Sequence, residues 1–205
     1  LGLEKLTFNG NTVDNISMLS GLTSLSYLRG EFNNIIDISA VADLSALTSV
    51  QLMGNPVASI AILSEIAAQL TELSMSLDSV TGISVLNTLT NMTYLSLAGG
   101  NSTNLDFVSS MPNLTFLGLQ SFINISDQLS KLSVLTKLLT LVLNGTPLID
   151  LNFVSEIKPL IDLSIDSTGI DDLSGLSAMI NLEGLNANDT GIVDISALAN
   201  MTNMQ

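Results

Sequence analysis

The sequence predicts an α/β repeat solenoid, with short parallel strands on one side and helical or extended return segments on the other. Apolar residues recur at intervals of 22 to 24 residues along the 205-residue chain, and internal periods of about 20 to 50 residues indicate repeat architectures. Each interval opens with apolar and polar residues in alternation, as in a strand. It continues with apolar residues at every third position, the period of a 3₁₀ turn.

Nine repeats align on their first apolar residue. The third and fifth residues after this start are also apolar, except at Gly30 in the fifth position. Because one unit cannot bury its apolar side alone, we expect stacked units to bury it against their neighbours. We predict a single domain over residues 1–205, with uncapped ends that indicate a piece of a longer protein, since Met204 begins a tenth repeat. The repeats start at Leu3, Leu25, Leu47, Leu70, Met92, Leu114, Leu138, Leu160 and Leu182.

Two polar positions recur after the predicted strands. The eighth residue after the start is Asn in the first three repeats and Thr in the last three. Asn carries both a donor and an acceptor, so we expect it to bond turn backbone in its own and adjacent repeats, and Thr to do part of this. Short polar pairs further on are predicted N-caps of the return segments. These pairs are Asn15 with Ser17, Asp37 with Ser39, Asp172 with Ser174, and Asp194 with Ser196.

The pattern L-x-x-L-x-L-x-x-N/T-x-I-x-D-I/L-S-x-L, clear in Leu160–Met179 and Leu182–Met201, resembles the internalin-type leucine-rich repeats of bacterial surface proteins. The resemblance covers essentially the whole chain. It implies a horseshoe with a parallel sheet on its concave face and 3₁₀, short-helical or extended returns on its convex face. A similar 22-residue repeat also occurs in intracellular leucine-rich proteins that regulate phosphatases.

The sixth repeat departs from this pattern. It has 24 residues, and its return segment is shifted by two positions. We expect a bulge or a widened turn within 99–128, and a tolerated loop insertion explains it more simply than a specialised binding loop. The residues that depart are Phe122 at the Asn position, Asn124 at a branched apolar position, and the shifted Leu129, Leu132 and Leu135.

Composition argues against several classes of function. The net charge is −14 with five basic residues, whereas phosphate backbones are bound by clustered Lys and Arg. We therefore predict no binding to nucleic acid or to an anionic membrane. No apolar run reaches the roughly 18 residues of a membrane span, so we also predict no membrane insertion. The acidic balance favours a cationic partner, although solubility alone also explains it.

Catalysis is not predicted, and no cofactor is expected. The chain has no His, Cys or Trp, so a serine nucleophile lacks its usual base and no thiolate metal site can form. The best carboxylate pair, Asp162 and Asp166, would lie about 13 Å apart along one strand, too far for glycosidase geometry.

One polar ladder is a secondary candidate for calcium. Asn144, Asp166 and Asn188 occupy the sixth position after the start of consecutive repeats. Asp162 and Asn186 are expected nearby. Calcium prefers oxygen ligands, but the two carboxylates and several amides of this group are few for tight binding. A solvated polar strand face is the simpler interpretation, and our primary prediction is no metal.

The concave face is the predicted binding surface, because the second, fourth and sixth positions after each start project outward from the strands. Tyr94 and Phe116 are expected on neighbouring strands, and exposed aromatic side chains are favoured interface anchors. The alternative is that a few exposed aromatics on a sheet are ordinary. The predicted contact residues are Tyr27, Arg29, Glu31, Gln51, Met53, Tyr94, Phe116, Gln120, Asp162, Asp166 and Asn186.

These features favour a non-catalytic module that recognises a protein or glycoprotein ligand, as part of a secreted or cell-surface adhesion protein. A surface that is polar through Ser, Thr and Asn agrees with an extracellular setting. Two alternatives remain open. The chain could pack laterally in an extracellular filament or surface layer, or it could be an intracellular regulatory subunit in the cytoplasm. The sequence does not determine the oligomeric state.

Overall fold

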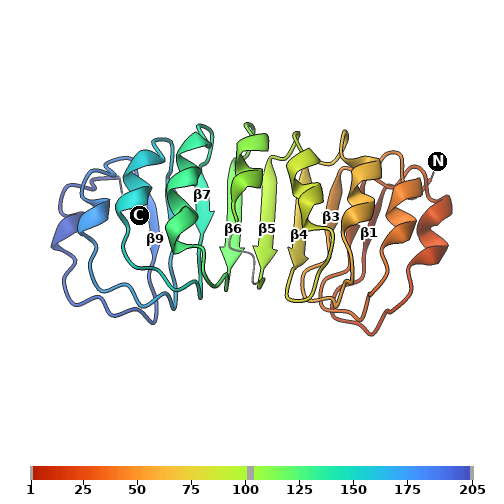
Figure 1. The fold of residues 1–205 in the computed structure, drawn as a ribbon, viewed down its shortest axis with the longest axis horizontal. Coiled ribbons are helices and arrows are strands. Elements are labelled where there is room, and N and C mark those ends of the chain that lie inside the picture. Colours follow the sequence, from red (N-terminus) through yellow and green to blue (C-terminus); the bar gives the residue numbers. More distant parts are fainter. Residues whose placement is uncertain (1, 101–103, 204–205) are drawn as a thin grey trace. The chain divides into compact units, whose positions relative to one another are not determined.

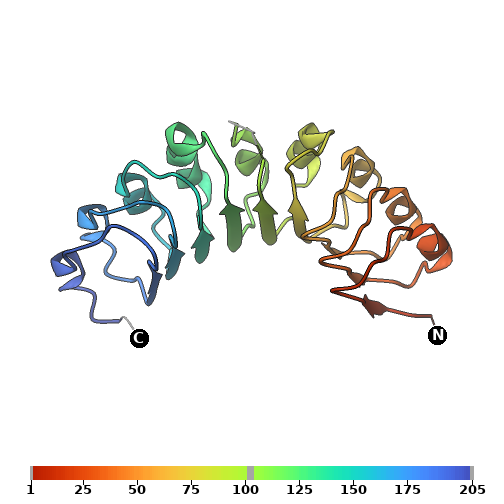
Figure 2. The same ribbon diagram turned by 90° about the horizontal axis from the view of Figure 1, so that it is seen from below.

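The structure, a computed structural model, describes residues 2–100 and 104–203. It divides into two compact units, the first over Leu1–Gly100 and the second over Asn101–Gln205. Within each unit the strands form one layer and the return helices the other, as Figures 1 and 2 show. Met204, the predicted start of a tenth repeat, lies outside the described residues.

Strands alternate with 3₁₀ helices throughout the described residues. The first unit contains β1 (Lys5–Thr7), η1 (Ser17–Gly21), β2 (Tyr27–Arg29), η2 (Ser39–Asp43), β3 (Ser49–Gln51), η3 (Ala61–Ile66), β4 (Glu72–Ser76), η4 (Ile83–Thr88) and β5 (Tyr94–Ala98). The second contains η5 (Asp106–Ser110), β6 (Phe116–Gln120), η6 (Ser126–Val134), β7 (Thr140–Val142), η7 (Asn152–Glu156), β8 (Asp162–Ser164), η8 (Ser174–Leu176), β9 (Gly184–Asn186) and η9 (Ser196–Leu198).

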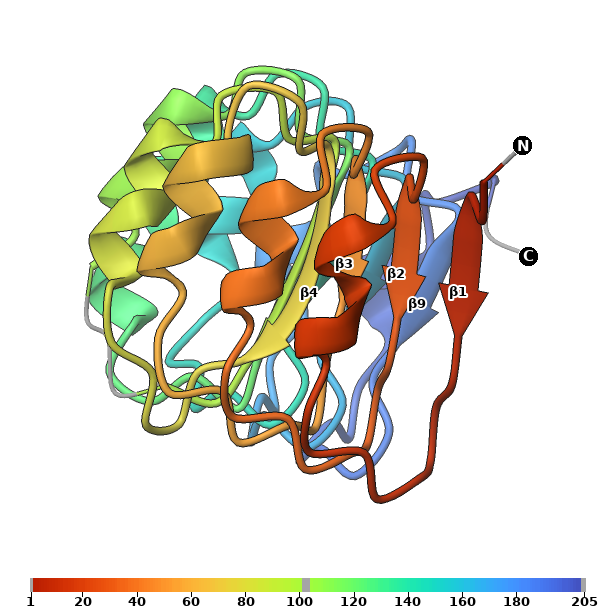
Figure 3. The ribbon, with the colours of Figure 1, turned by 90° about the vertical axis from the view of Figure 1, so that its right-hand side faces the viewer.

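The strands of each unit pair in parallel and in chain order. Residues at the same position of successive repeats are partners, as in Tyr27 with Ser49 in the first unit and Thr140 with Asp162 in the second. Figure 3 shows the first four strands side by side, with the return helices on one side of them. The repeat solenoid predicted from the periodicity is confirmed, and the returns are 3₁₀ helices.

The core of each unit lies between its strand layer and its helix layer. The first residues of repeats two to nine are all fully buried. The apolar residue three positions later is buried in repeats two to eight, for example Leu28 and Leu141, and Leu185 of the ninth repeat is half-buried. Leu3, which starts the first repeat, is 46% exposed. Burial of these regularly spaced side chains is the main stabilising term of the stack, since each buried Leu contributes on the order of 2 kcal/mol.

The Asn at the eighth position joins two repeats. The Nδ2 group of Asn55 donates to Leu52 O at 3.0 Å in its own repeat and to Gly30 O at 2.8 Å in the preceding one. Its Oδ1 accepts the backbone N–H of Ile35 at 3.0 Å. Asn33 makes the same three contacts one repeat earlier. The predicted bonds to turn backbone in the same and adjacent repeats are thus confirmed.

Thr at this position makes part of the same set. The Thr146 hydroxyl donates to Leu119 O of the preceding repeat at 2.8 Å, whereas Thr168 donates to Ile165 O within its own repeat at 2.7 Å. The hydroxyl is too short to bond the two carbonyls and the backbone N–H that an amide reaches. Asn is therefore the stronger link between repeats.

The predicted N-caps are wrong by position, because the N-cap of each helix is the apolar residue between the pair, namely Ile16, Ile38, Leu173 or Ile195, and it makes no side-chain hydrogen bond. The first residue of each pair, one position before the N-cap, bonds the start of the helix instead. Asp37 and Asp172 accept the backbone N–H of Ser39 and Ser174 at 2.8 and 2.7 Å. The serines are the first helical residues of η2 and η8, so they cannot be N-caps. Their hydroxyls donate to the same carboxylates instead. The backbone and hydroxyl bonds from Ser174 together hold the pKa of Asp172 below its usual range.

Gly30 has no side chain at the fifth position of its repeat, and a side chain from the first repeat fills the space. A Cβ built on Gly30 would lie 2.5 Å from Cζ of Phe8, so the ring of the first repeat occupies the space that Leu52 or Leu97 fills elsewhere. Gly30 is itself buried. Large and small residues thus interdigitate between neighbouring repeats, as close packing requires.

The sixth repeat differs from the others in its return segment, where helix η6 is nine residues long and Asn124 before it has a φ of 65°. The bulge or widened turn expected within 99–128 stays a prediction, since residues 101–103 lie outside the described residues. Phe122 is 1% exposed, so it fills the Asn position with an apolar side chain. The shifted Leu129, Leu132 and Leu135 are buried as well. The two extra residues of this repeat are therefore accommodated by a longer helix, and the apolar side chains remain buried.

We expect Asn55→Ala to lower the free energy of unfolding by about 2–3 kcal/mol, because it leaves the buried Ile35 N–H without its partner. Asn55→Thr should cost less, since a hydroxyl can still reach one carbonyl. Urea unfolding followed by circular dichroism measures both. Equal stability of Asn55→Ala and the wild type would contradict the proposed link.

We expect Gly30→Ala to cost about 1–3 kcal/mol, because the added methyl group meets the Phe8 ring. Gly21→Ala is the matched control, since nothing lies within 4 Å of a Cβ there. Pairing Gly30→Ala with Phe8→Leu should recover part of the loss in a double-mutant cycle. Additive losses in that cycle would show that the two side chains do not share one space.

Candidate binding surface

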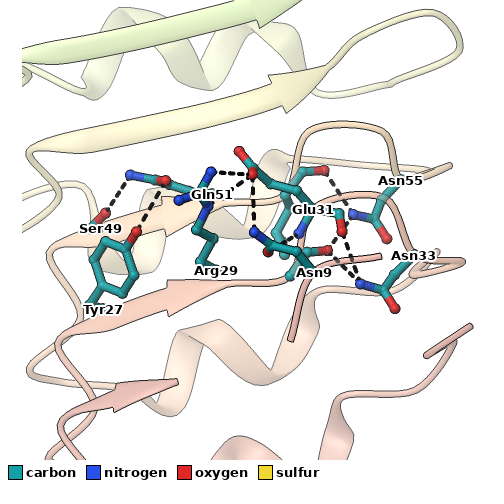
Figure 4. Close-up of polar contacts among 10 residues, drawn as sticks. Asn9, Tyr27, Arg29, Glu31, Asn33, Ser49, Gln51 and Asn55 are labelled. Atoms are coloured by element: carbon teal, nitrogen blue, oxygen red, sulfur yellow. Dashed lines mark hydrogen bonds and ion pairs between the residues drawn. The ribbon is translucent and has the colours of Figure 1, made fainter. Parts of the chain in front are cut away.

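The side chains on the strand side of each unit form the candidate surface, here called the strand face. In the first unit Arg29 and Glu31 lie on and just after β2, with an ion pair of 2.6 Å between Arg29 Nη2 and Glu31 Oε2 (Figure 4). Asn9 Nδ2 also donates to Glu31 Oε2 at 3.3 Å, and Asn9 Oδ1 accepts the Glu31 N–H at 2.9 Å. These bonds hold the Glu31 side chain at 14% exposure.

A chain of hydrogen bonds continues across β2, β3 and β4. Tyr27 Oη donates to Gln51 Oε1 at 3.3 Å, and Gln51 Nε2 donates to Ser49 Oγ at 3.5 Å (Figure 4). Ser49 Oγ donates in turn to Glu72 Oε2 at 2.8 Å. Four of the predicted contact residues, Tyr27, Arg29, Glu31 and Gln51, thus belong to fixed polar networks. A surface with fixed side chains loses less conformational entropy when a partner binds.

Met53 and Tyr94 extend the strand face of the first unit. Met53 is half-buried, and its Sδ atom lies 3.4 Å from Ser76 Oγ. Tyr94, on β5, is half-buried. Burial raises the pKa of its phenol, a hydrogen bond with Ser96 lowers it, and the negative charges of Glu31 and Glu72 raise it further.

The second unit has a more polar strand face. Phe116 and Gln120, at the two ends of β6, are half-buried, whereas Asp162 on β8 and Asn186 on β9 are exposed. A Cβ built on Gly184 would meet Asp162 Oδ1, so the absence of a side chain there makes room for the carboxylate.

The oxygen ladder of the second unit is held by hydrogen bonds between repeats. Asp166 Oδ1 accepts the Asn188 N–H at 2.7 Å and Asn188 Nδ2 at 2.9 Å, while Asn144 Oδ1 accepts the Asp166 N–H at 3.0 Å. Ser164 Oγ donates to Asn144 Oδ1 at 2.8 Å. A cation at this ladder would compete with these bonds. Among the described residues, no group of three or more His, Cys, Asp and Glu side chains could hold a metal ion.

Tyr94 and Phe116 belong to different units, Tyr94 to the first and Phe116 to the second. Each is half-buried on the strand face of its own unit. That they form one aromatic patch stays a prediction.

Phe32 is a residue that the sequence analysis missed. The seventh position after the repeat start has a left-handed backbone in eight repeats, at Gly10, Phe32, Gly54, Gly99, Ser121, Gly145, Ser167 and Asp189. Phe32 has φ of 54° and is 63% exposed. A left-handed backbone costs a residue with a side chain about 1–2 kcal/mol. An aromatic residue in a row of Gly, Ser and Asp is the signal that could have identified it.

We expect the pKa of Tyr94 to lie above the ordinary tyrosine value of about 10. The folded protein then holds the phenolic proton more tightly than the unfolded chain, so this contribution to stability is present below about pH 10 and is lost as pH rises through the raised pKa. The chain has two tyrosines, so Tyr27→Phe leaves one to titrate by tyrosinate absorbance. A midpoint at or below the ordinary value would contradict the assigned burial.

The described residues contain no helix that is long and apolar enough to cross a membrane. No protein-family model matches the chain, and a comparison with curated proteins also finds no match.

Solved structures do match. An internalin, InlF, from Listeria monocytogenes is 28% identical, with a TM-score of 0.79 over 99% of this chain and 59% of that one. A leucine-rich-repeat protein from Leptospira interrogans is 19% identical, with a TM-score of 0.75 over 98% of this chain and 53% of that one. The plant peptide hormone receptor RGFR1, solved in complex with RGF2, is 16% identical, with a TM-score of 0.65 over 98% of this chain and 35% of that one. This chain therefore spans between about a third and three fifths of the length of these three neighbours. Together with the 22-residue strand and 3₁₀ repeat, these similarities show that the chain has the leucine-rich-repeat fold, with repeats similar to those of an internalin.

Proposed function

We propose that the chain is a non-catalytic module that recognises a protein or glycoprotein ligand through its strand face, the concave face predicted from the sequence. The observation that carries this proposal is the fixed network of Tyr27, Arg29, Glu31 and Gln51 on the strand face of the first unit. Side chains held in place beside half-exposed aromatic rings are typical of binding surfaces.

The rest of the strand face supports the same proposal. Met53 and Tyr94 in the first unit, and Phe116 and Gln120 in the second, each leave part of an apolar or amide side chain open to solvent. Ser74 on β4 and Ser96 on β5, near Met53 and Tyr94 in the repeat order of the first unit, are buried. Large side chains that stand above small ones give a partner both anchors and room to approach.

The setting we propose is extracellular, as part of a secreted or cell-surface protein. The similarity to an internalin and to a plant receptor solved with RGF2 supports this setting and a polypeptide ligand. The small number of charged side chains, with 12% Asp, Glu, Lys and Arg, agrees with it.

The test compares wild-type protein with a Tyr94→Ala/Phe116→Ala variant in binding to purified ligands from a surface-protein pull-down. We expect the dissociation constant to rise tenfold or more, or about 1.4 kcal/mol, because both aromatic anchors are removed. Surface plasmon resonance measures this change.

A Met18→Ala/Ile149→Ala variant is the matched control, since these apolar side chains are 67% and 77% exposed and lie in or before return helices. All variants must first melt alike. Loss of binding in the control variant alone, or unchanged binding in the strand-face variant, would assign recognition to another surface. Concentration-dependent association without any ligand would instead favour lateral assembly.

A further inference from the structure

Phe32 carries two features that the fold does not require. Its backbone is left-handed, with φ of 54°, and its side chain is 63% exposed. Gly10, Gly54 and Gly99 occupy the same position in other repeats of the first unit, where glycine adopts this backbone without steric cost. A large apolar side chain that is both strained and mostly in solvent contributes little to the core. Such outliers gather at functional sites.

The ring is nevertheless held in a defined place. A Cβ built on Gly54 would lie 2.5 Å from Cδ1 of Phe32, so the ring rests against the turn of the next repeat, where glycine leaves room for it. The Phe32 N–H donates to Met53 O at 2.8 Å, which fixes the turn beneath the ring. An exposed ring in a fixed orientation can act as an anchor without ordering cost.

A hollow of about 580 Å³ begins at the glycine on which the ring rests. It runs between the turns of three repeats and is lined by Gly54, Pro56, Val57, Ser76, Asp78 and Val80, among others. Of the described residues that line it, only Asp78 carries a charge. The hollow thus brings the exposed Pro56 and the exposed carboxylate of Asp78 to one site, whereas Val57 is buried.

The charge of residues 1–100 indicates which charge a ligand of the hollow should carry. Residues 1–100 contain two basic side chains, Lys5 and Arg29, and Arg29 is already paired with Glu31. The acidic side chains of the same residues are Glu4, Asp14, Glu31, Asp37, Asp43, Glu65, Glu72 and Asp78. This excess of negative charge attracts cationic ligands and repels acidic ones.

We propose that Phe32 and the adjoining hollow form a second docking surface, at the turns beyond the strand face, for a cationic polypeptide segment. An apolar side chain of that segment packs on the Phe32 ring and on Pro56, and a neighbouring Lys or Arg pairs with Asp78. This surface adjoins the strand face at Ser76 but includes neither Tyr94 nor Phe116, so either proposal can fail without the other.

The test selects peptides on the wild-type protein from a phage-displayed library of random dodecapeptides and measures the affinity of the enriched peptides. We expect peptides with an aromatic or aliphatic residue beside Lys or Arg. Their dissociation constants should rise at least tenfold for Phe32→Gly and about threefold for Asp78→Asn, with the second loss disappearing at high salt.

The variants are chosen to keep the fold. Glycine and serine occupy the position of Phe32 in other repeats, so Phe32→Gly and Phe32→Ser should melt at or above the wild-type temperature. Ile149→Ser, which removes an exposed apolar side chain from the second unit, should leave affinity unchanged.

Three outcomes would overturn the proposal: no enrichment, enrichment of acidic or uncharged peptides, or equal affinity for wild type and both Phe32 variants. Peptides that bind Phe32→Gly normally but lose affinity for Tyr94→Ala/Phe116→Ala would overturn this inference and support the strand face alone. Peptides with the opposite response would support this inference, and the strand face would then be judged by its own binding test.

Discussion

Each repeat must turn sharply after its strand while the backbone of that turn is buried, and the side chain at the eighth position meets this constraint. In Asn33 and Asn55 the amide bonds carbonyls of two successive repeats and accepts a backbone N–H from the earlier one. A shift of one residue would break all three bonds. These bonds fix the register of the first three repeats, and the register places equivalent side chains in rows on the strand face. The part of the candidate surface around Tyr27, Arg29 and Gln51 therefore depends on two buried amides.

The periodicity was sufficient to predict the fold, because burial of one side of each repeat fixes which positions must be apolar. It also predicted which residues occupy the strand face, since the pairing of Tyr27 with Ser49 follows from equal positions in the repeat. The N-caps were predicted wrongly, because the spacing of each polar pair does not show that the apolar residue between them, such as Ile38 or Leu173, is the N-cap. The packing of Phe8 over Gly30 could not be predicted either, since it depends on side chains reaching across repeats.

The site was less predictable than the fold for a related reason. The sequence identifies which side chains share a row but not the bonds that they make. Arg29 and Glu31 could be grouped from the sequence, but their ion pair is seen only in the structure. The same holds for the hydrogen bonds that link Tyr27 to Glu72 through Gln51 and Ser49. The ladder of Asn144, Asp166 and Asn188 looked like a set of cation ligands, yet its oxygens bond neighbouring repeats. Phe32 was missed because the left-handed backbone of the seventh position becomes visible only when φ is known. That the 205 residues form one domain stays a prediction.

The central claim is that a polypeptide partner binds on the strand side, not on the side of the return helices. Radical footprinting of the protein with and without its bound ligand tests this claim directly, because it reports the solvent exposure of individual side chains. The account predicts protection of Tyr27, Met53, Tyr94 and Phe116, with Met18, Val134 and Ile149 modified as in the free protein. Protection confined to those last three side chains would contradict it.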